Sequence, residues 1–156
     1  MIFLETERLL LRNVLPGDGA VMADYRNNAL CSRYQRGQTK DPAEIAALIE
    51  RRQNDVFSVE APFMVAVALK ETNEMIGEIV VMPNDNVISL GYTFSYRYHR
   101  RGYAFEALTA LIDRLHQLAP DKEFLCFTDP RNVASMGLLQ KLDYKNLGYV
   151  PSLESQ

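Results

Sequence analysis

Several features are scarce in this sequence, and each shortage excludes a class of protein. Its 156 residues contain two cysteines and two histidines. Cys31 and Cys126 stand far apart, with no second Cys or His at metal-ligand spacing, so we expect reduced thiols and no metal site. No run approaches the roughly eighteen consecutive apolar residues of a membrane span, and Glu5, Glu7 and Arg8 come too early for a secretory signal. These absences predict a cytoplasmic protein that does not associate with a membrane.

A general excess of positive charge is also missing. The net charge is −3 and the isoelectric point is about 5.4, whereas binding to nucleic acid needs a broad basic surface. Positive charge is concentrated instead in Arg97, Arg100 and Arg101. A local basic cluster on an acidic protein suits a single polyphosphate ligand better than a polymer. We therefore expect no nucleic-acid partner.

The chain does contain enough apolar residues for one ordinary domain. Its composition is 47% apolar and 24% charged, so a chain of this length can bury a full core without disulfides or metals. No internal repeat, linker or low-complexity segment divides it. The expected organisation is a single domain over residues 1–156.

A strand, a turn and a helix are predicted in succession between Val87 and Leu115. Apolar residues up to Phe94 lead through the basic segment and Gly102 into a pattern with helical spacing. The first turn of such a helix offers unpaired backbone N–H groups and the positive end of the helix dipole, which together stabilise a phosphate. The apolar stripe of this helix is expected to pack on a sheet and comprises Ala104, Leu108, Leu111, Ile112, Leu115 and Leu118.

The segments before this unit are predicted from turn and capping signals. A strand is expected from Ile2 to Val14, and a helix capped by Asp18 from about Ala20 to Asn28. The mixed polar composition from Ala29 to Lys40 indicates a loop.

A second helix start is marked by three residues. Asp41 stands at the cap position, Pro42 at the first helical position, and Glu44 where it could reach back in a capping box. The helix is expected to continue to about Asn54.

The strands divide the chain into a meander and a crossover. Phe63 to Leu69 and Met75 to Met82 read as a hairpin that continues into the strand ending at Phe94. After the long helix we expect a strand from Glu123 to Thr128, a helix from Asn132 and an edge strand from Tyr144 to Val150. The fold class is therefore α/β (α+β), with a mixed, mostly antiparallel central sheet flanked by helices.

The turn and helix start also resemble a known motif. His99 to Ala104, followed by Glu106, Ala107 and Leu108, are similar to the acyl-CoA-binding motif of the GNAT superfamily of N-acetyltransferases, whose usual form is Gln/Arg-x-x-Gly-x-Gly/Ala. Gly102 and Ala104 match this form and His99 departs from it. Three further matches lie in the same order along the chain, at Leu4 to Arg12, Ile76 to Ile79 and Asn132 to Ser135. Together they resemble the branch that contains the ribosomal-protein alanine N-acetyltransferases.

The resemblance implies a GNAT-like fold and a ligand. It implies acetyl-CoA as cosubstrate, with the pantetheine arm on backbone groups freed where the strand ends and the pyrophosphate on the N–H groups of the turn. His99 could donate to a phosphate through its side chain or merely leave that side chain exposed. The implied cofactor-binding residues are Phe94, His99, Arg100, Arg101, Gly102, Tyr103, Ala104 and Asn132.

Two catalytic candidates follow. By resemblance, Ser135 matches a serine proposed as the general acid that protonates the departing thiolate. Many relatives have a tyrosine acid where this chain has Leu139, so that acid is missing here. Ser135 is the leading alternative acid, and a bound water is the other. Asn132 and Ser135 could equally be a helix cap and a neutral surface residue. Glu78, a carboxylate among apolar neighbours, is either the edge of a substrate pocket and a candidate base or a solvated strand position. Tyr92 and Ser89 are weaker candidates.

Two functions remain open at this point. The first is an acetyl-CoA-dependent N-acetyltransferase acting by direct attack of a primary amine, from a protein N-terminus or a small molecule, in a ternary complex. The second is a non-catalytic sensor or subunit that binds CoA or an acyl-CoA on the same scaffold. The family usually adds a further strand after about residue 150, so the sheet edge here is either bare or covered by a partner subunit, and a homodimer is possible.

Overall fold

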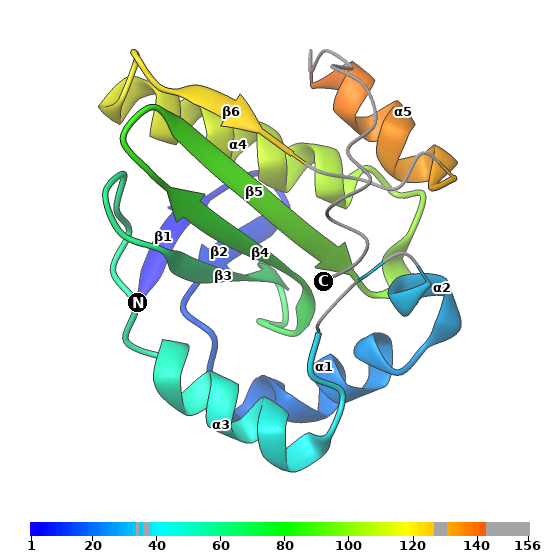
Figure 1. The fold of residues 1–156 in the computed structure, drawn as a ribbon. Coiled ribbons are helices and arrows are strands. Elements are labelled where there is room, and N and C mark those ends of the chain that lie inside the picture. The colour runs from blue at the N-terminus through cyan, green and yellow to red at the C-terminus, as the bar shows by residue number, and fades with distance from the viewer. Residues whose placement is uncertain (34, 36–37, 127–130, 143–156) are drawn as a thin grey trace.

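A central sheet with helices on both faces forms the described part of the chain (Figure 1). The computed structural model describes residues 1–33, 35, 38–126 and 131–142. Within them the sheet has six strands in the order β1-β2-β3-β4-β5-β6. The strands are β1 (Ile2–Glu5), β2 (Leu9–Arg12), β3 (Phe63–Leu69), β4 (Met75–Pro83), β5 (Val87–Phe94) and β6 (Glu123–Leu125). The helices are η1 (Pro16–Asp18), α1 (Gly19–Arg26), α2 (Ala29–Ser32), α3 (Pro42–Arg52), η2 (Tyr96–Tyr98), α4 (Tyr103–Leu118) and α5 (Val133–Lys141).

The strand pairing confirms the predicted mixed sheet. Each of the first four strands pairs antiparallel with the next, and β6 alone pairs parallel, with β5. The change of direction follows from α4, because a strand that is to lie parallel to its predecessor needs a crossover connection. The predicted turn at Gly102 therefore lies where β5 ends and the crossover begins.

The sheet separates two cores because strand residues point alternately to its two faces. In β3, Val65 and Val67 pack with the α4 side, whereas Met64 and Ala66 pack with α1 and α3. Burial on both faces explains why β3 is an unbroken apolar run.

The N-terminal half departs from prediction in two places. The single strand expected from Ile2 to Val14 is wrong, because β1 and β2 are two antiparallel strands joined by a turn in which Thr6 N–H donates to the Leu9 carbonyl at 2.9 Å. The segment from Ala29 to Lys40 is not wholly a loop, since it opens with the short helix α2.

The two predicted caps have different outcomes. Asp41 is confirmed, because its carboxylate accepts hydrogen bonds from the N–H groups of Ala43 and Glu44. The Glu44 carboxylate, however, accepts from the Thr39 hydroxyl instead of reaching back to the helix start. Asp18 stands at the cap position of α1 but makes no side-chain cap.

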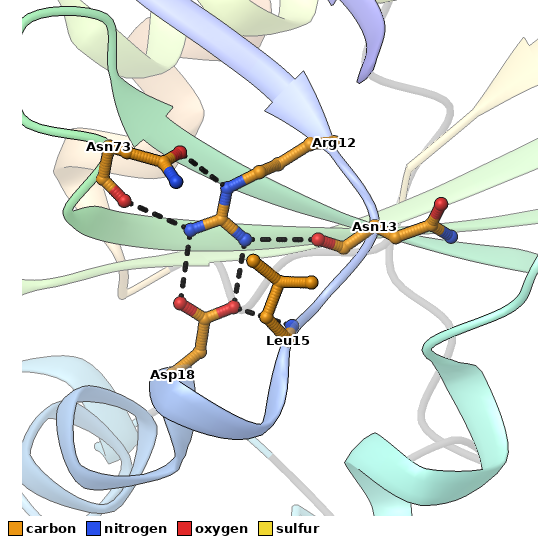
Figure 2. A network of polar contacts seen from close by, with 5 residues as sticks. All are labelled: Arg12, Asn13, Leu15, Asp18 and Asn73. Carbon is orange, nitrogen blue, oxygen red and sulfur yellow. Dashed lines mark hydrogen bonds and ion pairs between the residues drawn. The ribbon is translucent and has the colours of Figure 1, made fainter. Parts of the chain in front are cut away.

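The carboxylate of Asp18 instead belongs to a buried network around Arg12 (Figure 2). Arg12 and Asp18 are 4% and 6% exposed, and two hydrogen bonds of 2.8 and 3.0 Å join them. Arg12 also donates to Asn73 Oδ1, to the Asn73 carbonyl and to the Asn13 carbonyl, and Asp18 accepts from Leu15 N–H. All five guanidinium N–H donors thus have an acceptor. The network ties the β3–β4 turn to the segment that enters α1.

The long helix packs on the sheet largely as its apolar pattern predicts. Leu108, Leu111 and Leu115 are buried, and so is Ala107, which the predicted stripe left out. Leu118 was predicted on that stripe but is 47% exposed, because the helix ends there and its last turn projects past the core. In the described part of the chain, every helix is too short or too polar to cross a lipid bilayer.

The C-terminal elements are confirmed only where they fall within the described residues. The predicted strand from Glu123 is observed to Leu125, and α5 begins after Asn132 as expected. The edge strand predicted from Tyr144 to Val150 lies outside the described residues. A bare sheet edge and an edge covered by a partner subunit both stay predictions.

Candidate functional site

The turn between β5 and α4 has a strained backbone. Arg100 has φ 64° and Gly102 has φ 79°, so two residues separated by one are left-handed. The left-handed conformation costs a residue with a Cβ about 1–2 kcal/mol, whereas glycine adopts it freely. A Cβ on Gly102 would lie 3.4 Å from Arg8 Nη2. The positive φ is therefore the reason that this structure supplies for the glycine, and crowding of a phosphate by a Cβ stays a prediction.

A contact from the β1–β2 turn holds this segment in place. Glu106, in the first turn of α4, accepts hydrogen bonds from Thr6 Oγ1 at 2.5 Å, Arg8 N–H at 2.9 Å and Arg8 Nε at 2.6 Å. Arg8 Nη1 also donates to the Arg101 carbonyl at 3.0 Å. Partial burial raises the pKa of Glu106, but the hydrogen bonds from Thr6 and Arg8 outweigh it, and the pKa lies below its usual value. Two of the matched sequence segments, Leu4 to Arg12 and the turn with its helix start, thus meet at one carboxylate.

The basic and aromatic side chains of the turn stack on one another. The Arg101 guanidinium lies 5.8 Å from the centre of the Tyr98 ring, and Tyr98 meets Tyr103 edge-on at 6.2 Å. These contacts occupy the Arg101 and Tyr103 side chains. The turn therefore offers a ligand its backbone N–H groups beside the exposed side chains of Arg100 and Arg101.

Backbone groups at the end of β5 point away from β4. Ser95 N–H donates to the Ile76 carbonyl at 2.8 Å, and hydrogen-bonded pairs alternate along an antiparallel ladder. Tyr92 and Phe94 therefore direct their N–H and C=O groups toward the other side. The last β5–β6 pair is Ser89 with Leu125, so among the described residues no strand follows on that side.

Side chains occupy two of these carbonyls. The Phe94 carbonyl lies 2.7 Å from His99 Nε2 and 3.3 Å from Cys31 Sγ, and the Tyr92 carbonyl accepts from Gln35 Nε2 at 3.2 Å. His99 is exposed, as the second alternative expected, and its ring folds back onto the strand end. A contact between this ring and a phosphate stays a prediction. The amide N–H groups of Tyr92 and Phe94 face the same side as these carbonyls, beyond the last β5–β6 pair.

The ring of Phe94 is positioned by a glycine on the neighbouring strand. Gly77 pairs with Phe94, and a Cβ on Gly77 would lie 2.5 Å from Phe94 Cδ2 and 2.9 Å from the Thr93 carbonyl. The ring thus covers the place where a side chain would be. This contact explains the glycine of the Ile76–Ile79 match.

On the other side of the strand end, α5 brings Ser135 to Tyr92. The two hydroxyl oxygens are 2.6 Å apart. Burial raises the pKa of Tyr92 to about 12, although its hydrogen bond with Ser135 lowers it. Asn132 caps α5, because its Oδ1 accepts from Ser135 N–H at 3.1 Å. The capping alternative for Asn132 is therefore observed, while Ser135 is in a hydroxyl pair and not a lone surface group.

Glu78 lies in a buried network of hydrogen bonds and an ion pair. It is 2% exposed, and its carboxylate is joined to Arg26 by hydrogen bonds of 2.9 and 2.6 Å and to Tyr25 Oη by one of 2.6 Å. Burial, followed by the charge of Glu78, raises the pKa of Tyr25 well above its usual value. The solvated strand position is thus wrong for Glu78. A role as a catalytic base stays a prediction.

The two catalytic candidates lie on opposite faces of the sheet. Glu78 pairs with Thr93, so these residues share a face, and Tyr92 with its partner Ser135 is on the other. On the Glu78 face, Gln38 Nε2 donates to Thr93 Oγ1 at 2.9 Å, and Arg26 Nη1 donates to the Thr39 carbonyl. Gln38 and Thr39 are therefore joined to β5 and α1.

Some residues of the site have no motif in the sequence that could reveal them. Gln35 and Gln38 reach β5 from a segment with mixed polar composition, and only the fold shows the contact. Arg8 and Glu106 were part of recognised motifs, but nothing in their spacing indicated that they meet. Among the described residues, no three His, Cys, Asp or Glu side chains gather as a metal site would require.

Comparison with known proteins gives a family and a fold. The family model described as acetyltransferase (GNAT) domain matches residues 8–145. An uncharacterized N-acetyltransferase, p20 of Bacillus licheniformis, is 24% identical over 154 residues, which are 97% of this chain and 86% of that protein.

Solved structures agree with this match in their fold. A GNAT-family acetyltransferase from Bacillus anthracis superposes with a TM-score of 0.83 at 20% identity, over 97% of this chain and 87% of that one. A ribosomal L7/L12 alpha-N-protein acetyltransferase, solved in complex with coenzyme A, gives a TM-score of 0.78 at 15% identity, over 95% and 86%. These likenesses confirm the predicted fold.

Proposed function

Because this chain belongs to the GNAT acetyltransferase family, we propose that it transfers the acetyl group of acetyl-CoA directly to a primary amine, on a protein N-terminus or a small molecule, in a ternary complex. The single observation that carries the proposal is the end of β5. There the backbone of Phe94 points away from β4, and the left-handed turn through Gly102 follows in the chain. The hydroxyl of Tyr92, two residues before Phe94, is paired with the hydroxyl of Ser135.

In this proposal the backbone holds the donor. The pyrophosphate lies on the N–H groups of Arg100 to Ala104, where the helix dipole and the basic cluster both favour an anion. The pantetheine arm runs along the outward N–H groups of Tyr92 and Phe94 as an added strand would. Asn132 contributes by fixing the start of α5, since its side-chain oxygen is already bonded to Ser135 N–H.

The chemistry is one bond made and one bond broken. The neutral amine nitrogen attacks the thioester carbonyl carbon, the C–N bond forms, and the C–S bond breaks to release the CoA thiolate. The attacking amine loses a proton to water, and the thiolate gains one from the Ser135 hydroxyl. Tyr92, 2.6 Å from Ser135 Oγ, orients that hydroxyl and can pass a proton to it, and the hydroxyl pair regains its proton from the water that took the proton of the amine. Orientation and proton supply are the protein's share of the catalysis.

The acceptor enters from the α1–α2 side in this proposal. Gln35 and Gln38 border the β5 end there, and Glu78 with Arg26 and Tyr25 forms the rigid layer behind them. We assign Glu78 a role in holding this wall, because both its oxygens already accept hydrogen bonds. A protein N-terminus suits direct attack better than a lysine side chain, since an α-amino group has a pKa near 8 and lysine one near 10.4.

The first test is binding. Calorimetric titration of the wild type with acetyl-CoA should give a micromolar Kd, and Gly102→Leu should abolish binding, because leucine opposes the left-handed backbone. Failure of the wild type to bind acetyl-CoA would sink the proposed function.

The second test is turnover. Release of free CoA thiol, followed with a panel of N-terminal peptides and small amines, should reveal at least one acceptor. Ser135→Ala should lower kcat about 100-fold with little change in KM for acetyl-CoA. Val133→Ala, on the same helix and 79% exposed, is the matched control. Equal kcat for Ser135→Ala and the control would refute Ser135 as the acid and leave water in that role.

A further inference from the structure

We propose that Arg8 is a positioning residue for the donor: by holding the Arg101 carbonyl, it fixes the Gly102 N–H in the orientation that faces the pyrophosphate. The proposal rests on the proposed function, because it assumes that acetyl-CoA binds at this turn. Arg8 lies in the β1–β2 turn, far from the motif in sequence, and its side chain is 43% exposed.

The argument begins with the geometry of one peptide unit. In a planar trans peptide, the carbonyl of one residue and the N–H of the next point in opposite directions. Arg8 Nη1 donates to the Arg101 carbonyl at 3.0 Å from the β1–β2 side. The Gly102 N–H must therefore point away from Arg8, toward the open side of the helix start.

This peptide needs such a contact because its surroundings hold it loosely. The peptide unit joins Arg101 to Gly102, a glycine with φ 79° whose backbone rotates freely, and it comes one residue after Arg100, which has φ 64°. Without a partner for the Arg101 carbonyl, the unit can rotate and present its oxygen to the ligand side. A carbonyl oxygen there would repel a phosphate that the N–H would bind.

The shape of the arginine side chain suits this task. Its Nε donates to Glu106 Oε1 at 2.6 Å while Nη1 holds the carbonyl, and the guanidinium lies 4.4 Å from the centre of the Tyr103 ring. A planar fork can make these contacts at once, whereas a lysine ammonium is a single point on a flexible stem. The pairing also neutralises Glu106, whose charge lies close to the proposed pyrophosphate position.

The test compares two acyl donors. S-acetylpantetheine has the same thioester as acetyl-CoA but lacks the pyrophosphate, so a defect in the orientation of Gly102 N–H should affect only acetyl-CoA. We expect Arg8→Ala and Arg8→Lys each to raise KM for acetyl-CoA on the order of tenfold, as for loss of a hydrogen bond to a charged group. For both variants, kcat with acetyl-CoA and kcat/KM with S-acetylpantetheine should stay at the wild-type value.

Further variants separate this role from charge and from folding. Arg114→Ala removes an exposed arginine from α4, the helix that follows the turn, and is the control for general electrostatic attraction. Glu106→Gln weakens the Nε contact while it leaves Arg8 in place, and should raise the KM for acetyl-CoA in the same direction by a smaller factor.

Three results would overturn the inference. One is full recovery in Arg8→Lys, which would make the effect one of charge. Another is an equal loss with both donors, which would make it general damage. The third is an unchanged KM for acetyl-CoA in Arg8→Ala while the wild type binds acetyl-CoA, in which case the proposed function stands without this residue. If the wild type binds no acetyl-CoA, the proposed function itself has failed.

Discussion

Replacing Gly77 by alanine should destabilise the protein and disturb the donor site together. The added Cβ would lie 2.5 Å from Phe94 Cδ2, 2.8 Å from Phe94 Cγ and 2.9 Å from the Thr93 carbonyl. A contact below 3 Å cannot persist, and the obstacles are a buried ring and a backbone oxygen. Either Phe94 must turn out of its place or β4 and β5 must separate locally.

The expected cost follows from overpacking. Extra atoms in a packed core cost about 1–3 kcal/mol, and for a chain of this length about 1 kcal/mol lowers Tm by roughly 2–4 °C. We therefore expect Gly77→Ala to melt about 2–12 °C below the wild type. Because Phe94 must move, the KM for acetyl-CoA should rise as well.

A matched control lies on the neighbouring strand. Gly91, in β5, has nothing within 4 Å of the place where a Cβ would be, so Gly91→Ala should be neutral or slightly stabilising. Thermal unfolding of both variants, followed by circular dichroism, measures the difference. If the two variants melt at the same temperature, the contact between Gly77 and Phe94 does not constrain the sheet as we argue.

Three more predictions concern charge and pH. Arg12→Met leaves the buried Asp18 carboxylate without its partner and should cost about 3–5 kcal/mol in urea unfolding; a midpoint near that of the wild type would contradict this. Because the pKa of Glu106 is lowered in the folded state, its stabilisation is present above about pH 4.5 and fades as pH falls, so Glu106→Gln should lose less stability than the wild type between about pH 6 and pH 3. Because burial raises the pKa of Tyr92 to about 12, any alkaline limb of the rate below about pH 10 should keep its midpoint in Tyr92→Phe; a shifted midpoint would show that Tyr92 titrates there.

The turn and its helix were predictable because their signals are local. The apolar stripe through Leu108, Leu111 and Leu115 repeats with the helical period, and Gly102 marks a position whose positive φ carries no Cβ penalty. The hairpin of β3 and β4 was predictable for the same reason, since two apolar runs and a polar turn are read within a few residues.

The β1–β2 hairpin was missed because its pattern is ambiguous. Leu4, Leu9, Leu10 and Leu11 fit one long strand as well as two short ones, and no glycine or proline marks the turn. What bends the chain is Thr6, whose side chain accepts from Leu9 N–H and donates to Glu106. That second contact joins positions 100 residues apart, so no local signal could reveal it.

The sequence alone therefore determined the order of the elements from the α3 helix to β6, the mixed sheet and the position of the turn at Gly102. These depend on period, on capping and on the conformational freedom of one glycine, all of which act over a few residues. The tertiary structure decided which side chains meet: Arg8 with the Arg101 carbonyl, Ser135 with Tyr92, and Glu78 with Arg26. Such pairs depend on how strands register and which face a residue takes, and a polar side chain reads the same in sequence whether its partner is water or a buried charge.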